Sequence, residues 1–479
     1  MNSPGGFDAI IIGSGAGGAA AAYELAGAGW SVLVLEKGRR LPLDGSTLDI
    51  QQVVHGGRFL SQEPWSDSEG RALIPEEHFN VGGKTCWYGA ALLRFAPHEF
   101  APDPIYECPG WPITYDDLAP YYERVEQLLD VRTFATEPAL GRIVDRIRAR
   151  DPRWQTLPMP MGLSAGIRAN AFEATHFDGF ASVAGLKHDA NTAFLDRVAG
   201  LPNFRLEEGA EVAELLMADP TKRQVTGVRL TDGRVFEGAR LFLAAGALHS
   251  PRLLQRLIER HGLAARLPAA AEVGRRLKLH LLTALIAVSP GKKHDQLRKT
   301  ALLSHPNYPH SSAQPLGFDG ELIGTLLPGF VPHPLATAIG SRAYGFFLLT
   351  EDGSARDNQI REAVAAHGVD RVFDYRETRT PYAAREHRDF VRSFQRALLH
   401  AGMVSFTQRI GLKGTAHACG TLSTGNDPTQ SVVDSDGRVH GFEALYVVDG
   451  SVLPRSSRVN PSLTIFAWSL RVADRLVDL

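Results

Sequence analysis

The hydrophobic pattern at the start of the chain alternates between buried strands and a helix. A short apolar run from Ala9 to Ile12 predicts a parallel strand that is covered on both faces. An Ala-rich segment from Ala19 to Gly27 predicts a helix, and Ser31 to Leu35 predicts a second buried strand that ends in Glu36. Strand, helix and strand in this order are typical of a parallel βαβ unit.

The turn between the first strand and the helix contains Gly13, Gly15 and Gly18 in a G-x-G-x-x-G spacing. The first glycine permits a tight turn, the second lets the backbone approach a pyrophosphate, and the third lets helix and strand pack closely. The helix N-terminus presents unpaired N–H groups to the phosphates. Glu36 can accept hydrogen bonds from ribose hydroxyls. The combination predicts a dinucleotide site and makes an ordinary glycine-rich turn the weaker interpretation.

The middle of the chain has a weaker pattern. Residues 41–79 lack periodicity and predict an excursion with short elements at most, and residues 142–190 show no clean period. Trp111–Val131 predicts a helix that starts near Thr114 or Asp116. Further elements are expected as a helix at Asn191–Ala199, strands at Phe204–Leu216, Val225–Leu230, Arg234–Glu237 and Leu241–Ala245, and a helix from Arg252.

From residue 273 onward, strand-like runs alternate with loops rich in Pro, His and Gly. The runs Leu281–Val288, Glu321–Leu327 and Arg342–Leu349 predict a mostly antiparallel sheet. We therefore predict an α/β fold (α+β overall) in which a Rossmann-type dinucleotide-binding domain carries an inserted substrate domain. The expected parts are 1–272, with 41–79 and 142–190 contributing to the substrate side, then the insert at 273–408, and a C-terminal part at 409–479 with a strand at Ala444–Val448 and a helix at Leu463–Leu476.

Composition narrows the class of protein. The 479 residues suggest two or three domains, and 51 Lys and Arg against 53 Asp and Glu argue against nucleic acid as the main partner. No apolar run reaches membrane-spanning length and no signal-like segment precedes the first strand, so we expect no membrane span and a cytoplasmic location. Cys86, Cys108 and Cys419 are too few and too scattered to predict disulfides or a metal site.

Two residues near the C-terminus are candidates for chemistry. His417 could take the hydroxyl proton of an alcohol while a hydride leaves toward an oxidised flavin, since an imidazole with a pKa near ~6.5 suits a base at neutral pH. On the residues alone, a single histidine before glycine-rich turns is more often structural. Asn460, before Pro461, has an equally ordinary explanation as a turn residue or a helix cap.

Several stretches together resemble the glucose–methanol–choline (GMC) family of FAD-dependent oxidoreductases over nearly the full chain. They are IIGSGAGG with VLVLEKG, VGGKTCWYGA, WPITYDDLAPYY, AAGALHSPRLL, VGRRLKLH, and the long run from HACGTLSTG to SLRVADRL. By this resemblance His417 falls on the catalytic histidine and Asn460 on a second catalytic position, which is Asn or His in the family. The FAD contacts that it implies are Gly82, Gly83, Val212, Asp449, Gly450 and Thr464, beside Gly13, Gly15, Gly18 and Glu36.

Some positions depart from the family pattern. Trp87 stands where members with covalently attached flavin carry a histidine, so the resemblance implies noncovalent FAD. After Ser250-Pro251 the chain continues with Arg-Leu-Leu, whereas the family motif continues toward a Ser-Gly pair.

The resemblance implies oxidation of an alcohol group to a carbonyl on a polar substrate, nearest to bacterial members that act on sugars, glycosides and aminoglycosides. His417 would remove the proton, flavin N5 would accept the hydride, and O2 or another acceptor would take the electrons. Polar residues of the insert are candidates to line a polyol pocket, although each is more often a solvated loop position: His305, Asn307, His310, Arg342, Tyr344 and Asp352.

Alternatives stay open at this point. The same scaffold could act on choline, an aryl alcohol or a sterol, or serve a non-redox lyase such as a hydroxynitrile lyase that keeps FAD. A flavin-binding protein without activity and a nicotinamide-only dehydrogenase are further possibilities. The choice between oxidase and dehydrogenase is also open.

Overall fold

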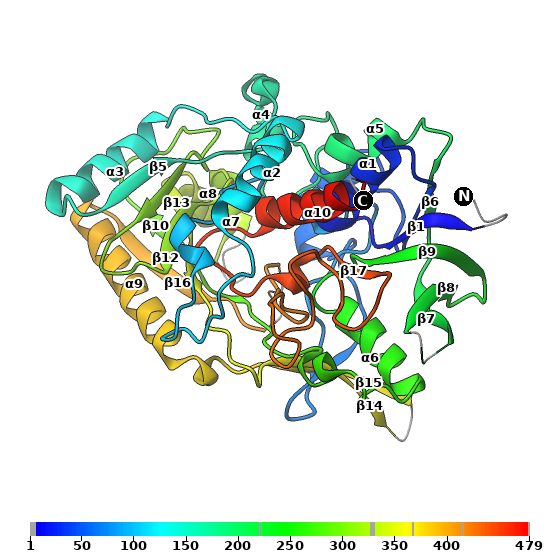
Figure 1. The fold of residues 1–479 in the computed structure, drawn as a ribbon. Coiled ribbons are helices and arrows are strands. Elements are labelled where there is room, and N and C mark those ends of the chain that lie inside the picture. The colour runs from blue at the N-terminus through cyan, green and yellow to red at the C-terminus, as the bar shows by residue number, and fades with distance from the viewer. Residues whose placement is uncertain are drawn as a thin grey trace.

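The computed structural model describes residues 6–219, 221, 223–325, 331–365, 368–412, 414 and 416–477. In Figure 1 the sheet that holds the first βαβ unit lies on the right and a second sheet lies on the left. Helix α10 (Ser462–Val477) runs between them. The C-terminal helix therefore lies between the two parts of the molecule that contain these sheets.

The first sheet contains the predicted βαβ unit. Its strand order is β6-β2-β1-β9-β8-β7, and β17 also pairs with β9. Strands β1, β2, β6, β9 and β17 are parallel, whereas β7 and β8 extend the sheet in antiparallel fashion. The bounds are β1 Phe7–Ile12, β2 Val32–Glu36, β6 Phe204–Glu208, β7 Val212–Asp219, β8 Gln224–Leu230, β9 Val235–Leu243 and β17 Leu445–Val447. The predicted α/β class is confirmed.

The second sheet is antiparallel throughout its described pairs, as predicted. Its order is β16-β10-β13-β12-β11-β5. Helix α9 (Pro381–His400) packs on β10, β13 and β16, and α3 (Pro138–Arg150) packs on α9. The strands are β5 Gln155–Pro158, β10 His280–Val288, β11 Ala301–Ser304, β12 Ser311–Pro315, β13 Ala343–Glu351 and β16 Val404–Arg409.

A smaller sheet joins the excursion after the first unit to the insert. Its order is β14-β15-β3-β4, and β15 pairs in parallel with β3. The strands are β3 Trp65–Asp67, β4 Ala72–Leu73, β14 Gln359–Ala365 and β15 Gly368–Asp374. Residues 41–79 therefore contain short elements only, as their lack of period indicates.

The remaining helical elements connect and cover these sheets. Among them, α1 (Ala16–Gly27) contacts β1, β2 and α10. Helix α2 (Tyr115–Leu128) is capped by the predicted Thr114, whose hydroxyl accepts from the Asp117 N–H. The others are η1 Ser46–Leu48, η2 Gln51–His55, η3 Gly83–Cys86, η4 Pro97–Phe100, η5 Ala165–Ala169, α4 Ala171–Thr175, η6 Asn191–Leu195, α5 Asp196–Val198, α6 Ser250–Arg260, η7 Pro268–Glu272, α7 Gly320–Thr325, α8 His333–Gly340, η8 Glu377–Arg379 and η9 Gly450–Val452.

One predicted strand is wrong. Residues 320–325 form helix α7, and residues 326 and 327 of the expected strand lie outside the described part of the chain. Gly320 and Gly340 let α7 pack tightly on α8, since a Cβ on Gly340 would lie 2.0 Å from the Gly320 carbonyl oxygen. The neighbouring apolar residues Leu322 and Ile323 are both buried by this packing, which a strand with one solvated face would not allow.

Two strand boundaries also differ from the prediction. The expected strand at 204–216 is divided into β6 and β7 at Gly209, whose φ of +67° is a left-handed conformation that interrupts a strand. The expected strands at 234–237 and 241–245 are the single strand β9, because β9 pairs with β8 through its first half and with β1 along most of its length.

The first turn of α1 packs against backbone. A Cβ on Gly18 would lie 1.9 Å from the Gly13 carbonyl oxygen, and a Cβ on Gly17 would lie 1.9 Å from the Val448 carbonyl oxygen. Ala19 to Ala22 are fully buried behind them. The predicted role of the third glycine, close packing of helix and strand, is what this geometry requires.

Replacing Gly18 by valine is expected to lower the free energy of unfolding by about 1–3 kcal/mol or more, because overpacking a filled site forces the backbone apart. The matched control is Gly27→Ala at the other end of α1, where an added Cβ meets no atom within 4 Å. That variant should be unchanged or slightly more stable, since alanine favours the helix. Denaturant unfolding followed by circular dichroism measures both, and equal midpoints for Gly18→Val and the parent chain would contradict the packing argument.

Candidate active site

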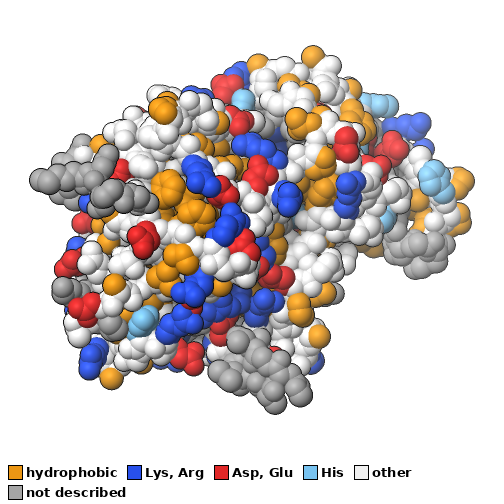
Figure 2. Space-filling model, turned by 90° about the vertical axis from the view of Figure 1, so that its right-hand side faces the viewer, with side chains coloured by type: hydrophobic (Ala, Val, Ile, Leu, Met, Phe, Trp, Pro, Cys, Tyr) orange, Lys and Arg blue, Asp and Glu red, His pale blue; other side chains and the backbone are white. Residues whose placement is uncertain are grey.

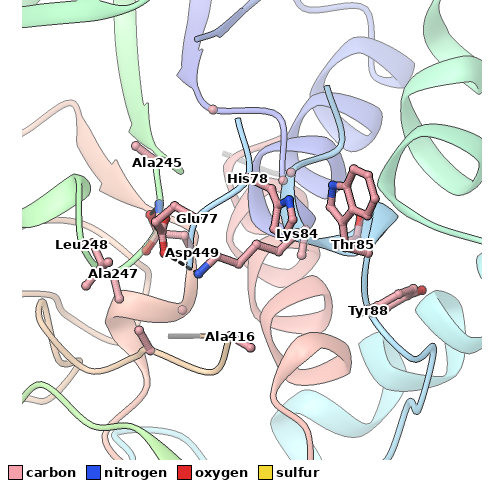
Figure 3. A pocket seen from close by; sticks show the side chains of 18 of the residues that line it. Glu77, His78, Lys84, Thr85, Tyr88, Ala245, Ala247, Leu248, Ala416 and Asp449 are labelled. Carbon is pink, nitrogen blue, oxygen red and sulfur yellow. Dashed lines mark hydrogen bonds and ion pairs between the residues drawn. The ribbon is translucent and has the colours of Figure 1, made fainter. Parts of the chain in front are cut away.

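A cavity of about 740 Å³ connects the first sheet with the C-terminal loops. Glu36 and Val212 line it from the first sheet, and His417 and Asn460 line it from the C-terminal part. Figure 3 shows part of its wall, where Lys84 extends toward Glu77 beside Asp449. Residues more than 400 positions apart in the chain therefore face one cavity.

The glycine turn before α1 is open to this cavity. Gly15 is the N-cap of α1 and has no side-chain capping hydrogen bond, and a Cβ there would meet no atom within 4 Å. The loop of residues 81–90, here termed the glycine-pair loop, lies on the turn: the Gly82 N–H donates to Ser14 Oγ at 3.0 Å. Backbone donors and open space at a helix N-terminus fit a pyrophosphate.

Glu36 is held in place by the same turn. Its Oε2 accepts from Ser14 N and Ser14 Oγ at 3.0 and 2.6 Å, and its Oε1 accepts from Gly38 N at 2.8 Å. Burial raises the pKa of this carboxyl, and the hydrogen bonds from Ser14 and Gly38 oppose that rise. A fixed acceptor at the tip of β2 fits the ribose of a dinucleotide.

Asp449 joins the C-terminal segment to the loop after β9. Its Oδ2 accepts from Gly246 N at 2.8 Å and from Ser250 Oγ, and its Oδ1 accepts from Ser451 N at 2.9 Å. Burial raises its pKa. Gly450 follows and lines the cavity. The loop after β9, which belongs to the AAGALHSPRLL stretch of the family resemblance, is therefore tied directly to Asp449 through Gly246.

His417 lies beside a second histidine because of an antiparallel bridge. Lys278 and Cys419 exchange backbone hydrogen bonds of 2.9 and 3.0 Å, which places His280 opposite His417. The two Nδ1 atoms are 2.8 Å apart. Nε2 of His417 lies 3.4 Å from Nδ2 of Asn460.

Burial lowers the pKa of both imidazoles of this pair. Burial, reinforced by His280, Lys299 and Lys84, holds the pKa of His417 well below its usual range. Burial also lowers the pKa of His280 to about 4. At neutral pH His417 therefore has an unprotonated ring nitrogen available as a base.

Polar groups that the sequence did not single out complete the wall. Gln314 donates from Nε2 to Oδ1 of Asn460 at 2.7 Å, and Lys299 pairs with Asp178 at 2.9 Å, with both side chains largely buried. Asp178 lies in the aperiodic segment 142–190, and neither Lys299 nor Gln314 belongs to a motif. The VGRRLKLH stretch supports the family resemblance, but no pattern singles out its His280.

The six polar candidates of the insert do not line this cavity. Tyr344 donates to Asp295, Asp352 accepts from Thr380, and His305 pairs with Asp151. They are occupied within the second sheet and its surroundings.

Most of the predicted cofactor contacts do reach the cavity. Three do not line it: Gly18 packs on the turn, Gly82 supports the turn through Ser14, and Thr464 is buried with its hydroxyl 2.7 Å from Tyr122 Oη. Those that line it are Gly13, Gly15, Glu36, Gly83, Val212, Asp449 and Gly450, together with His417 and Asn460.

No helix among the described residues is long and apolar enough to cross a membrane, and no group of three His, Cys, Asp or Glu side chains among them is arranged around a metal position. On the face in Figure 2, Lys and Arg side chains gather toward the lower half with Asp and Glu side chains among them. Cys86, Cys108 and Cys419 are buried and free, and neither Cys86 nor Cys419 lines the cavity.

Comparison with known proteins identifies the family. Residues 8–288 match the family model for FAD dependent oxidoreductase, and residues 355–469 match the model for GMC oxidoreductase. The chain is 29% identical to 6‴-hydroxyparomomycin C oxidase of Streptomyces lividus and 28% identical to paromamine 6′-oxidase of Streptomyces fradiae, over 98% of this chain and 90% of each relative. Its fold is similar to that of pyridoxine 4-oxidase from Mesorbium loti, with a TM-score of 0.67, 16% identity and 98% of both chains covered.

The first family model spans more than half of the chain, and the second covers the segment that holds His417 and Asn460. The open glycine turn, the fixed Glu36 and the cavity between them fit FAD as the cofactor. The chain belongs to the GMC family of FAD-dependent oxidoreductases.

Proposed function

We propose that this enzyme oxidises an alcohol group of a sugar, glycoside or aminoglycoside to a carbonyl, with His417 as the base. The observation that carries the proposal is the position of the His417 imidazole at the cavity wall, where its Nε2 lies 3.4 Å from the Asn460 amide nitrogen and burial holds its pKa low. An alcohol oxygen beside both groups would give its proton to His417 and accept a hydrogen bond from Asn460. FAD, when bound, accepts the hydride from the carbinol carbon.

The cavity supports a polar substrate. The Asp178–Lys299 pair offers both acceptors and donors to hydroxyl groups, while Phe318 and Phe347 supply apolar contact. Lys299 and Lys84 pair with Asp178 and Glu77, so neither of these carboxylates is left to bind a quaternary ammonium such as choline, which prefers aromatic faces and negative charge. Both relatives named above are oxidases of aminoglycosides by name, which supports the same substrate class here.

We also propose noncovalent attachment of FAD. Trp87 occupies the position of the attachment histidine, lines the cavity, and donates its indole N–H to Asn80 Oδ1 at 2.9 Å. An indole offers no nucleophile for a bond to flavin, because its nitrogen lone pair belongs to the aromatic ring and its N–H is held by Asn80. The roles of Gly13, Gly15, Glu36, Gly83, Val212, Asp449 and Gly450 as FAD contacts belong to this proposal, as do supporting roles for Gly18, Gly82 and Thr464.

The proposal also covers the division of the chain into domains, the electron acceptor and the cellular compartment. We infer an FAD-binding domain from 1–272 and 409–479 and a substrate domain from 273–408, with β5 and β3 as contributions of the two excursions. O2 is the proposed electron acceptor, which the names of both relatives support. The three free cysteines suit a cytoplasmic location.

Replacing His417 by alanine is expected to slow flavin reduction by about 10²–10⁴-fold, the usual contribution of a general base. The measurement is the loss of the oxidised-flavin absorbance after anaerobic mixing with substrate. The control is His400→Ala, an exposed histidine at the end of α9, which should reduce at the parent rate. Equal rates for His417→Ala and the parent enzyme would remove His417 as the base.

Anaerobic titration with different alcohols tests the substrate class. Amino sugars and glycosides are expected to bleach the flavin, whereas choline and sterols are not, because the cavity offers charged and hydroxyl-binding groups. Admission of air should restore the colour within seconds for an oxidase. Bleaching by sterols alone would contradict the proposal, and cleavage of a cyanohydrin without any bleaching would indicate a lyase.

The pH dependence of kcat/KM reports the protonation of His417 in the free enzyme. Only the neutral imidazole accepts a proton, so activity is lost when the pH falls through the pKa of His417. Because that pKa is held well below 6.5, kcat/KM is expected to stay level as the pH falls through 6.5 and to decline only at more acidic pH. An acidic limb centred near 6.5 would show that the buried, electropositive surroundings do not act on the base.

A further inference from the structure

We propose that His280 is a positioning residue that fixes the tautomer of His417, so that Nε2 of His417 carries no proton and faces Asn460. This inference rests on the proposed role of His417 as the base. Its evidence is a chain of hydrogen bonds in which each donor determines the next.

The first hydrogen bond is made to the carbonyl oxygen of Ser457, which can accept a hydrogen bond but cannot donate one. Nε2 of His280 lies 2.8 Å from that oxygen, so the proton of this imidazole is on Nε2. Ser457 is fully buried with a φ of +66°, a left-handed conformation that a serine adopts only when its surroundings hold it. Its N–H donates to Glu351 Oε1 at 3.1 Å and its hydroxyl donates to Glu99 Oε1 at 2.6 Å. The acceptor is therefore fixed in direction.

The second step is the contact between the two imidazoles. A neutral His280 with its proton on Nε2 has a bare Nδ1, which can only accept. Nδ1 of His417 lies 2.8 Å away and must therefore carry the proton. The bridge between Lys278 and Cys419 holds the two rings in this register.

The third step determines that the free lone pair of His417 is on Nε2. With its proton on Nδ1, a neutral His417 has a bare Nε2. Nδ2 of Asn460 lies 3.4 Å from it and supplies a donor, while Gln314 donates to Oδ1 of Asn460 and so favours the same amide orientation. The basic nitrogen thus faces the cavity, where the alcohol would bind.

The charged groups around the pair are consistent with two neutral rings. Glu351 faces His280, but Arg455 and His310 pair with its carboxylate. Lys299, paired with Asp178, and Lys84, paired with Glu77, line the cavity with His417 and lower its pKa. His280 also lines a smaller cavity, together with Tyr375, Glu377 and Arg409.

Two amide variants separate positioning from simple packing. In His280→Asn the side-chain amide lies near the former Nδ1, so its oxygen can still accept from His417. In His280→Gln the amide lies near the former Nε2, so it keeps the bond to Ser457 and presents methylene groups to His417. A wrong tautomer on a catalytic histidine costs up to about 10⁴ in kcat. We expect at least about tenfold slower flavin reduction in His280→Gln than in His280→Asn, with equal FAD content.

A direct measurement needs no variant at position 280. In holoenzyme labelled with ¹⁵N-histidine, the His417 signals, identified by their loss in His417→Ala, should show a protonated Nδ1 and an unprotonated Nε2. The same pattern is expected in His280→Asn and should be lost in His280→Gln. A protonated Nε2 in the parent enzyme, or equal reduction rates in the two amide variants, would overturn the positioning role. Unimpaired reduction in His417→Ala would instead overturn the base itself.

Discussion

The close approach of helix α1 to the C-terminal segment is the constraint on which the site depends. Gly17 lies so near the Val448 carbonyl that no side chain fits between them, and Ser469 of α10 donates to the Gly17 carbonyl oxygen. The same approach sets β17 beside β9 and brings Asp449 to the loop after β9. Because the glycine turn and the C-terminal loops share one contact surface, a nucleotide on the turn and an alcohol beside His417 would meet in one cavity.

A buried ion pair supports the loop that leads to Asn460 in the cavity wall. Arg455 and Glu351 are almost completely buried, and Arg455 Nε donates to Oε1 of Glu351 at 2.7 Å. Burial alone would raise the pKa of Glu351, but hydrogen bonds from His310 and Arg455 hold it at about 2, so the pair is charged at neutral pH. Such a pair contributes little net stability, since desolvation offsets the attraction. Its effect here is to fix the strained Ser457 and the loop that leads to Asn460.

The fold is predictable from the sequence where the interactions that form it are local. The βαβ unit, the Thr114 cap and the closing helix follow from period, glycine spacing and capping, and the structure has each of them. The structure is not predictable where it depends on contacts between residues that are far apart in the sequence. Helix α7 exists because two glycines allow it to pack on α8, and the surroundings of His417 depend on pairings between residues 278 and 419 and between 314 and 460. No spacing along the chain encodes those pairings. The sequence therefore does not predict that His280, Gln314 and Lys299 lie near His417 and Asn460.

The low pKa of His417 constrains the order of events in the proposed oxidation. A neutral imidazole with a depressed pKa is a weak base, and an alcohol is a far weaker acid than an imidazolium, so full proton transfer before hydride loss would be strongly uphill. As the carbinol carbon loses hydride, positive charge develops on it and the hydroxyl becomes acidic. A weak but correctly oriented base is then sufficient. The reaction therefore requires a correctly oriented base rather than a strong one. For this reason the tautomer held by His280 and the amide oriented by Gln314 matter more here than a strong base would.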